Sequence, residues 1–403
     1  ISNNPQSIYK SIKNYINKSC RKIAEKFVKS EDAFLINTYL SSKKLIQLEL
    51  LLGQFPQLWK KFEINSDKKP NKSLRKKLTQ NFLKKSEDDL ENISRILLFE
   101  LLPVCYLEGF EELKNIVNQQ PWPKSPKFIF TSNSYGSDEI FKIYTAIKTE
   151  TGSKYYVGQH GNGYFTSRHC FPKTEEKTVD KFLTWGWSNK SPKYVPMFVF
   201  KTAGKSIKFN NKGGLLLIEQ PQDTRYLPWD VHNQFFNYFE EQKKFVSQLS
   251  QEPKKKLTIR LSAARANKKF NETLRWFDFD KSLKIDDGKI PINYLIKRSR
   301  LIVHGYDSTG LLETLSQNIP CLAFWQNEFD HLLENVRPDY QKLVDAGIVH
   351  FSSKSIADKV NEIWNNVDEW WLQKNIQDSK KQFCEIYANS CKKPIRKMAS
   401  FFK

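Results

Sequence analysis

The chain has 403 residues, of which 39% are hydrophobic and 14% aromatic, so it can bury a substantial core and is not disordered by composition. It carries 65 Lys and Arg against 44 Asp and Glu, and the resulting net charge of +21 favours anionic partners such as nucleotides, nucleic acid or an anionic membrane surface. No stretch is long and apolar enough to span a membrane, the start lacks the apolar core of a secretory signal, and the six scattered cysteines match neither a zinc nor a disulfide framework, so we expect a cytoplasmic protein.

The first 120 residues are predicted to be largely helical. Ile8, Ile12, Ile16 and Ile23 recur near one helical stripe, and residues 87–117 continue in the same style. The densest basic segment, residues 67–89, lies between these stretches. We interpret it first as a solvated loop and helix face, and second as a docking site for a membrane surface. Prolines at positions 121, 123 and 126 then mark a boundary.

After this boundary, short apolar strands alternate with helices. A strand at 127–132, a capped helix that ends at Gly152 and a strand at 154–159 form a β-α-β unit, which we expect to be parallel and right-handed. Further strands are predicted at 180–187 and 195–201. A polar, glycine-bearing linker precedes a second series, with strands at 214–220, 255–261, 300–306 and 319–325, helices between them and a helical C-terminal stretch.

Two such series predict an α/β fold with two Rossmann-like lobes. We expect residues 1–205 to form an N-terminal lobe, helical to residue 120 and Rossmann-like over 121–205. Residues 206–403 are expected to form a C-terminal lobe with terminal helices. Ligands of such folds bind beyond the carboxyl ends of the strands, so the turns that follow the strands are the places to search for a site.

The turn after the strand at 300–306 is the strongest candidate. Asp307, Ser308, Thr309 and Gly310 open a helix there, and a helix N-terminus presents free N–H groups and a positive dipole to a phosphate. Glu313, one turn further on, is a candidate acceptor for ribose hydroxyls. The alternative is that Asp307 or Ser308 is an ordinary N-cap. The chain has neither a Walker A loop nor the dinucleotide-binding glycine pattern, which argues against ATP hydrolysis and NAD binding.

Other polar residues end neighbouring strands of this half. Arg260 and Arg265 would suit a nucleotide phosphate, although surface pairing with acidic residues explains them equally well. Gln220 and Asp223 follow the strand at 214–220 and are expected to line the cleft between the lobes. No set of His, Cys, Asp or Glu residues has the spacing of a metal site, and no nucleic-acid-binding module is recognisable.

In the first half, His160 follows the strand at 154–159. Imidazole titrates near neutrality, so a histidine at a strand end is a candidate general base. The competing interpretation is a structural histidine in a tight turn. Gln159 and Gly161 flank it, and Asn133 and Ser134, which end the neighbouring strand, are predicted to share the same cleft.

These features together resemble GT-B glycosyltransferases, and within them the bacterial surface-carbohydrate group of capsule-polysaccharide and O-antigen-locus transferases. The stretches that carry the resemblance span most of the chain: AFLINTYL, LGQFPQLW, YVGQHGNGYF, FLTWGW, LTIRL and YDSTGLLETLSQNIPCLAFW.

The resemblance implies metal-independent transfer of a sugar from a nucleotide donor, without a cofactor, to a lipid-linked or oligosaccharide acceptor, as in capsule or lipopolysaccharide biosynthesis. The implied donor is a CMP-linked 3-deoxy-2-ulosonic acid. The resemblance makes residues 1–205 the acceptor lobe and residues 206–403 the nucleotide-sugar-binding lobe. The Ser-Thr-Gly turn would hold the CMP phosphate and Glu313 the ribose. Such an enzyme works at the cytoplasmic face of the inner membrane as a peripheral protein, and no nucleic-acid partner is expected.

Teichoic-acid glycerophosphate polymerases are similar at two points, because they also pair a His-Gly turn, assigned as the base, with a phosphate-binding turn bearing two hydroxyls. The chain departs from both groups. Asp307 stands where relatives tend to have asparagine, and RLSAAR replaces the His-Pro element of the polymerases. The missing His-Pro element weakens the polymerase interpretation, and a CDP-alditol phosphotransferase is kept as one alternative. A non-catalytic protein that binds nucleic acid or anionic glycans through its positive charge is another.

Overall fold

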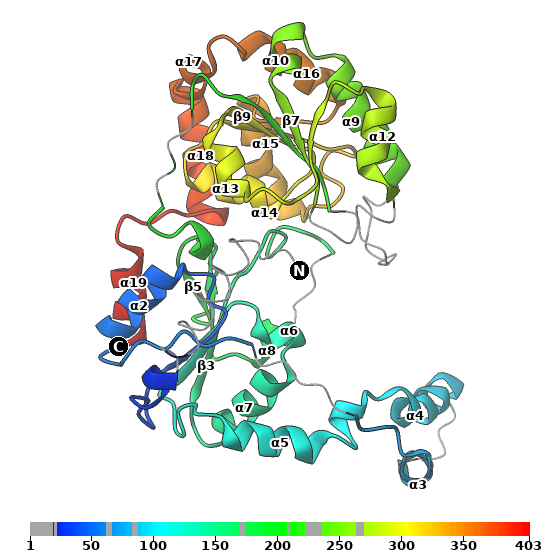
Figure 1. Cartoon of the computed structure of the whole chain (residues 1–403), viewed down its shortest axis with the longest axis vertical. Helices are drawn as coiled ribbons and strands as arrows, with labels where there is room; N and C mark the ends of the chain where they lie inside the picture. The colour runs from blue at the N-terminus through cyan, green and yellow to red at the C-terminus, as the bar shows by residue number, and fades with distance from the viewer. Residues whose placement is uncertain are drawn as a thin grey trace, which may run out of the picture. The chain divides into compact units, whose positions relative to one another are not determined.

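The computed structural model describes residues 19, 22–61, 67–82, 88–169, 174–205, 207, 210–221, 235–262 and 270–403. The chain divides into two compact units, residues 1–158 with Lys403, and residues 159–402 (Figure 1). The lobe boundary expected near residue 205 stays a prediction.

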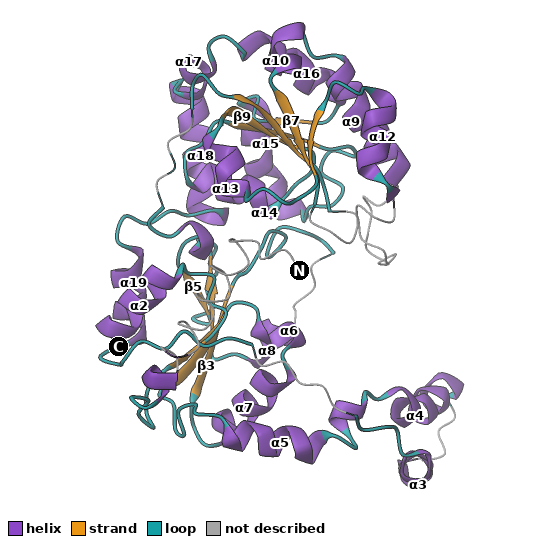
Figure 2. Cartoon of the chain, in the orientation of Figure 1, coloured by secondary structure: helices purple, strands orange, loops and turns teal. Residues whose placement is uncertain are grey.

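The first sheet has five strands in the order β1-β2-β3-β4-β5 (Figure 2). These are β1 (Phe34–Leu35), β2 (Phe128–Thr131), β3 (Lys154–Gly158), β4 (Lys181–Thr184) and β5 (Tyr194–Pro196). β1 pairs with β2, β2 with β3, and β4 with β5, each in parallel register. The helical prediction for the first 120 residues omitted β1, because two fully buried residues give no periodicity that separates a strand from a helix.

Seven helices of the described residues accompany this sheet: α2 (Ser42–Leu51), α3 (Lys72–Phe82), α4 (Asp89–Leu101), α5 (Phe110–Gln119), α6 (Ser134–Ser137), α7 (Glu139–Glu150) and α8 (Thr174–Thr178). The predicted helix between β2 and β3 is divided in two at Asp138. The carboxylate of Asp138 accepts a hydrogen bond from the Phe141 N–H at 3.1 Å and so caps α7. Ile140, Phe141 and Tyr144 are buried on the inner face of α7.

The predicted strand at 195–201 is shorter in the structure. β5 ends at Pro196, and residues 200–202 form a 3₁₀ turn. The chain leaves the sheet there because the Val199 N–H donates to the Asn389 carbonyl at 2.9 Å instead of to a strand neighbour. Such a long-range partner is invisible to local sequence patterns.

The second sheet has six parallel strands in the order β11-β10-β9-β6-β7-β8 (Figure 2). These are β6 (Gly214–Ile218), β7 (Leu257–Arg260), β8 (Lys284–Asp286), β9 (Ser299–His304), β10 (Cys321–Phe324) and β11 (Val349–His350). The first strand, β6, lies in the middle, and the chain proceeds from it first to one side and then to the other. This is the strand order of a Rossmann fold, with its switch point between β6 and β9.

The helices around the second sheet are α9 (Phe235–Ser247), α10 (Gln251–Lys255), α12 (Glu272–Phe279), α13 (Ile292–Lys297), α14 (Thr309–Ser316), α15 (Arg337–Asp345), α16 (Ser353–Ile363), α17 (Val367–Trp371) and α18 (Lys374–Tyr387). The last helix, α19 (Pro394–Phe402), lies instead beside β5, where the Lys397 ammonium donates to the Pro196 carbonyl at 2.8 Å (Figure 1). β9 and β10 are buried almost throughout, as continuous apolar runs in parallel sheets are. The expected fold class, α/β with two Rossmann-like parallel sheets, is confirmed.

Gly186, which follows β4, provides a test of the packing in the second unit. Its φ is +133°, and a Cβ built there would collide with the Glu385 carbonyl oxygen of α18. We expect Gly186→Ala to lower the free energy of unfolding by about 3 kcal/mol, because both the backbone and the neighbouring helix oppose it. Gly136→Ala is the control, since no atom lies within 4 Å of a Cβ there. The measurement is the free energy of unfolding by calorimetry, and equal values for the two variants would contradict this account.

Candidate functional site

The switch point brings the carboxyl ends of β6 and β9 together. Ile218 pairs with His304, and the Gly305 N–H donates to the Ile218 carbonyl at 2.9 Å. Glu219 and Gln220 follow β6, while the turn that opens α14 follows β9. In open parallel sheets this crevice is where ligands bind, so the predicted phosphate-binding turn stands at the favoured position.

Ser308 is the N-cap of α14. Its buried hydroxyl accepts from the Leu311 N–H at 2.9 Å and lies 3.2 Å from Nδ1 of His304. The cap interpretation is therefore the one that the structure supports for the Ser308 side chain. The Thr309 hydroxyl is also engaged, because it accepts from the Asn162 N–H at 3.0 Å. An anion at this turn would have to rely on backbone N–H groups and the helix dipole.

His304 supports the turn from below. It is fully buried, and its Nε2 lies 3.1 Å from the Thr314 hydroxyl. Burial lowers the pKa of His304 to about 3, so the ring is neutral at physiological pH. A Cβ at Gly310 would lie only 3.1 Å from this ring, so the glycine allows the helix start to approach the histidine.

The Gln-His-Gly turn after β3 is hydrogen-bonded to the turn after β9. Besides the bond to Thr309, Asn162 donates from Nδ2 to Oδ1 of Asp307 at 2.8 Å. A Cβ at Gly161 would lie 3.1 Å from the Thr309 hydroxyl. The predicted base turn and the predicted phosphate turn are thus in direct contact.

The Asp307 carboxylate connects this contact to two further residues. Its other carboxylate oxygen lies 3.0 Å from Nε2 of His331 and accepts from the Tyr340 hydroxyl at 3.1 Å. The side chain faces these donors, so its negative charge is satisfied within the protein. Burial raises the pKa of Tyr340 well above its usual range, and the Asp307 carboxylate adds to this, so the hydroxyl keeps its proton and remains a donor.

His160 belongs to a chain of three polar groups. Its Nδ1 lies 2.9 Å from the Tyr164 hydroxyl, and that hydroxyl donates to the Glu175 carboxylate at 2.6 Å. A tyrosine hydroxyl has one proton, so the Nδ1 of His160 must be the donor in the first bond. Nε2 is then the nitrogen with the lone pair, which is the form that a general base requires.

Three predicted residues have structural partners. Gln159 is buried, and its amide donates to the Gly161 carbonyl at 3.0 Å and accepts from the Trp185 N–H at 2.9 Å, so it shapes the turn. The Glu313 carboxylate lies 3.2 Å from the Lys201 ammonium. Arg260 pairs with Asp286 and donates to the Ile290 carbonyl at 2.7 Å, as the surface-pairing alternative anticipated.

The remaining predicted residues lie elsewhere. Asn133 and Ser134 belong to the first unit, where both N–H groups donate to the Thr131 hydroxyl and the buried Ser134 hydroxyl accepts from Asn37 at 3.2 Å. Gln220 follows β6, and its N–H donates to the Tyr238 hydroxyl at 2.7 Å. Asp223 and Arg265 lie outside the described residues.

Sequence reasoning missed five residues of this arrangement: Asn162, Tyr164, Glu175, His331 and Tyr340. Asn162 and Tyr164 stand within four positions of His160, so a search for partners within one turn of the chain would have found them. Nothing in the local sequence points to the other three, which approach from distant segments.

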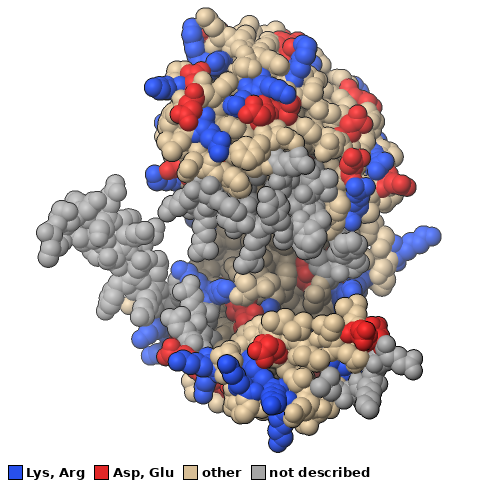
Figure 3. Space-filling model, turned by 90° about the vertical axis from the view of Figure 1, so that its right-hand side faces the viewer, with Lys and Arg blue, Asp and Glu red and all other residues tan. Residues whose placement is uncertain are grey.

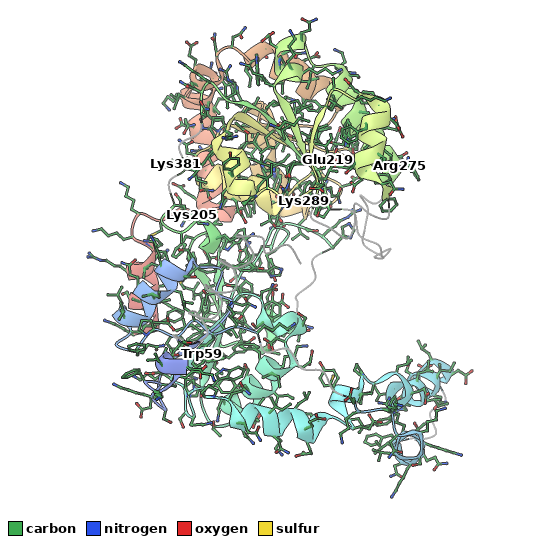
Figure 4. The ribbon with its side chains drawn as sticks, viewed as in Figure 1. Trp59, Lys205, Glu219, Arg275, Lys289 and Lys381 are labelled. Atoms are coloured by element: carbon green, nitrogen blue, oxygen red, sulfur yellow. The ribbon has the colours of Figure 1, made fainter. Side chains whose placement is uncertain are left out.

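A pair of buried acids lies at the end of β6. Glu219 follows β6 (Figure 4), Glu272 lies in α12, and they are 2% and 1% exposed. Within the part of the chain that the structure describes, one carboxylate oxygen of each has no hydrogen-bond partner. The other Glu219 oxygen accepts from Nε1 of Trp276 at 3.1 Å. Burial raises the pKa of Glu219 well above its usual range, with Glu272 adding to the effect, and burial raises the pKa of Glu272 to about 7.

Among the described residues, no three His, Cys, Asp or Glu side chains gather as metal ligands. None of the described helices has the length and apolar character needed to cross a bilayer.

The model of the LIC12162 family transferase matches residues 1–402. The chain belongs to this transferase family. None of the curated proteins matches the sequence of this transferase.

Several solved structures are similar in fold at low identity. S. aureus MnaA, solved with UDP, has 11% identity and a TM-score of 0.45, with 91% of this chain and 94% of that chain covered. Anabaena HepE, solved with UDP-glucose, has 9% identity and a TM-score of 0.46, with coverage of 92% and 98%. Acinetobacter baumannii MurG has 9% identity and a TM-score of 0.41, with coverage of 93% and 99%.

The buried acid pair predicts how the stability of this transferase depends on pH. The pKa of Glu272 rises from 4.5 to about 7 on folding, so the folded state binds a proton more tightly than the unfolded state. The contribution of Glu272 to the free energy of unfolding should therefore fall between pH 4.5 and 7 and level off above that range. Glu272→Gln removes the free-energy cost of a buried ionised carboxylate. The variant should therefore be more stable than the parent protein by up to about 3 kcal/mol at pH 8, but not at pH 4.5.

The measurement is denaturant unfolding at both pH values. Glu369→Gln, at an exposed position of α17, is the matched control and should leave the pH dependence unchanged. A Glu272→Gln variant with the pH dependence of the parent protein would refute the assignment.

Proposed function

We propose that the chain is a GT-B-type glycosyltransferase that moves a sugar from a nucleotide donor to a hydroxyl of a glycan acceptor. One observation carries the proposal. The turn that bears His160 is hydrogen-bonded, through Asn162, to Thr309 at the start of α14, beside the switch point of the second sheet. A base and an anion-binding helix end thus occur in one arrangement, as transfer from a phosphate leaving group requires.

In the proposed reaction, the diphosphate or phosphate of the donor binds at the N-terminus of α14. The N–H groups of Thr309 and Gly310 and the helix dipole stabilise the negative charge that develops as the bond between the sugar carbon and the phosphate oxygen breaks. The Ser308 and Thr309 side chains hold the turn in shape, because both hydroxyls are already engaged. A metal ion and a cofactor have no role in the proposal.

His160 is the proposed general base. As the acceptor oxygen bonds to the sugar carbon, Nε2 takes the acceptor proton, and the nucleotide leaves with the phosphate oxygen. Tyr164 and Glu175 are positioning residues. The Tyr164 hydroxyl accepts a hydrogen bond from Nδ1–H of His160, so the proton stays on Nδ1 and the lone pair on Nε2. The imidazolium that forms would be stabilised through the same pair of bonds.

The donor and acceptor classes rest on the resemblance to surface-carbohydrate transferases. We propose a CMP-linked ulosonic acid as donor and a lipid-linked or oligosaccharide surface glycan, of the capsule or O-antigen kind, as acceptor. The enzyme would then work in the cytoplasm as a peripheral protein of the inner membrane, without a nucleic-acid partner.

The donor proposal predicts selective nucleotide binding. Among CMP, CDP, UDP, GDP and ADP, CMP should raise the melting temperature most, because at equal concentration the nucleotide with the lowest Kd stabilises the folded state most. Thr309→Pro should abolish the shift, since it removes an N–H of the helix start. Thr258→Ser, a half-buried hydroxyl in the middle of β7, is the control. Equal shifts with all five nucleotides would remove the preference for cytidine.

The base assignment predicts a separation of binding from turnover. His160→Ala should keep the CMP-induced shift but lose about 10²–10⁴-fold in kcat for sugar transfer, as loss of a general base does. His169→Ala, a nearby histidine outside the arrangement, should keep its activity. Tyr164→Phe should lower kcat with little change in donor KM, and ¹⁵N NMR of the His160 ring should lose the Nδ1–H signature of the parent protein. Undiminished transfer by His160→Ala would end the assignment.

A further inference from the structure

Helices α3 and α4 pack against one another in the first unit and are here called the hairpin (Figure 1). One buried arginine fixes the pair. Arg75 is 3% exposed, and its guanidinium pairs with both carboxylate oxygens of Glu108 at 2.8 Å. Its Nη1 also donates to the carbonyls of Phe99, Glu100 and Leu102 at 2.7, 3.1 and 2.9 Å. These bonds place the N-terminal half of α3 beside the C-terminal end of α4.

The face of α4 that meets α3 is distinct from its outer face. Phe99 packs on Phe82 with ring centroids 5.3 Å apart, and Arg95 donates to the Phe82 carbonyl. No residue of α4 is buried. Its outer face carries six aliphatic side chains that are 43–71% exposed: Leu90, Ile93, Ile96, Leu97, Leu98 and Leu101.

Four of these side chains lie on one stripe. Leu90, Ile93, Leu97 and Leu101 recur every three or four residues, which is the spacing of a helix-packing seam. A contiguous exposed apolar patch of this kind marks an interaction surface, whereas exposed leucines that stand singly are ordinary.

The charges of the hairpin indicate which kind of partner can pack against the stripe. On α4, Asp89 lies at the N-terminal end and Glu100 beside the stripe, and both are exposed. On α3, Lys72 and Lys76 are exposed and share one side of the helix. None of these four residues forms an ion pair with another part of the chain that the structure describes. Figure 3 shows this side of the molecule, where acidic and basic side chains lie among uncharged ones.

An anionic membrane fits this pattern poorly, because helices that lie on such membranes have lysines and arginines along their polar face, and the charges nearest to the α4 stripe are acidic. A second hairpin of the same kind fits it well. When two α4 helices pack antiparallel, the acidic N-terminal end of each meets the C-terminal end of the other, and Arg75 holds the lysine-bearing end of α3 beside that end.

We propose that α4 packs antiparallel against α4 of a second copy of this chain, so that the stripe is buried in a two-fold interface and Asp89 lies near Lys72 and Lys76 of the other copy. The same surface serves both copies, so the contact closes on itself and yields a dimer. The antiparallel arrangement also sets the two helix dipoles in opposition, which favours the pairing.

Sedimentation equilibrium of the full chain tests the proposal. The parent protein should be a dimer. Leu97→Ser/Leu101→Ser should weaken dimerisation at least about 100-fold, because each of the two copies loses two leucine side chains from the interface. Leu274→Ser/Leu372→Ser is the matched control, since these leucines are 60% and 65% exposed outside the hairpin. Circular dichroism of each variant checks that its helices are retained. A dimer unaffected by the stripe substitutions would overturn the proposal.

A charge exchange tests the antiparallel register. Lys72→Glu/Lys76→Glu should weaken the dimer about tenfold, and adding Asp89→Lys to the same chain should restore much of the loss. A membrane surface cannot produce this rescue. A parent protein that is monomeric at every concentration, but sediments with phosphatidylserine vesicles through the leucines of the stripe, would replace the second copy by a lipid surface.

Discussion

The arrangement around His160 depends on the burial of a single carboxylate. The Asp307 side chain is 8% exposed, and a charge removed from water to this extent is tolerated only when donors surround it. Asn162, His331 and Tyr340 supply them, each from a different segment of the second unit. Because three segments donate to one carboxylate, movement of any of them would remove a hydrogen bond from a buried charge, and this cost holds the turns in register.

This constraint alters how the proposed phosphate-binding turn is understood. A negative charge beside a phosphate would repel it, and Asp307 stands where relatives tend to have asparagine. The carboxylate is instead directed into its cluster of donors, and the hydroxyls of Ser308 and Thr309 hold the turn together. The positive end of α14 is therefore left to the backbone, whose N–H groups cannot be changed by substitution of side chains. Such a site tolerates sequence change as long as the helix start keeps its position.

The sequence predicted the parts of the fold whose signal is local. β2, β3, β6, β7, β9 and β10 are short apolar runs bounded by turn residues, and all lie where the pattern placed them. β1, β8 and β11, with two or three residues each, are too short to show any period. The order of the strands, and hence the switch point, could not be predicted from the sequence, because it depends on which strands pair. The same holds for the contact between Asn162 and Asp307, 145 positions apart.

The glycines show why the candidate site was only partly predictable. Glycines such as Gly161 and Gly310, in turns that follow strands, allow close approach of a ligand or of another segment, and the structure gives each of them a close neighbour within the protein. A Cβ at either position would lie 3.1 Å from a neighbouring side chain, the Thr309 hydroxyl in one case and the His304 ring in the other. A side chain at Gly161 would push the His160 turn away from α14, and one at Gly310 would push α14 away from its supporting histidine. The glycines thus set the distance between the His160 turn and the start of α14, a role that a sequence pattern cannot separate from direct contact with a ligand.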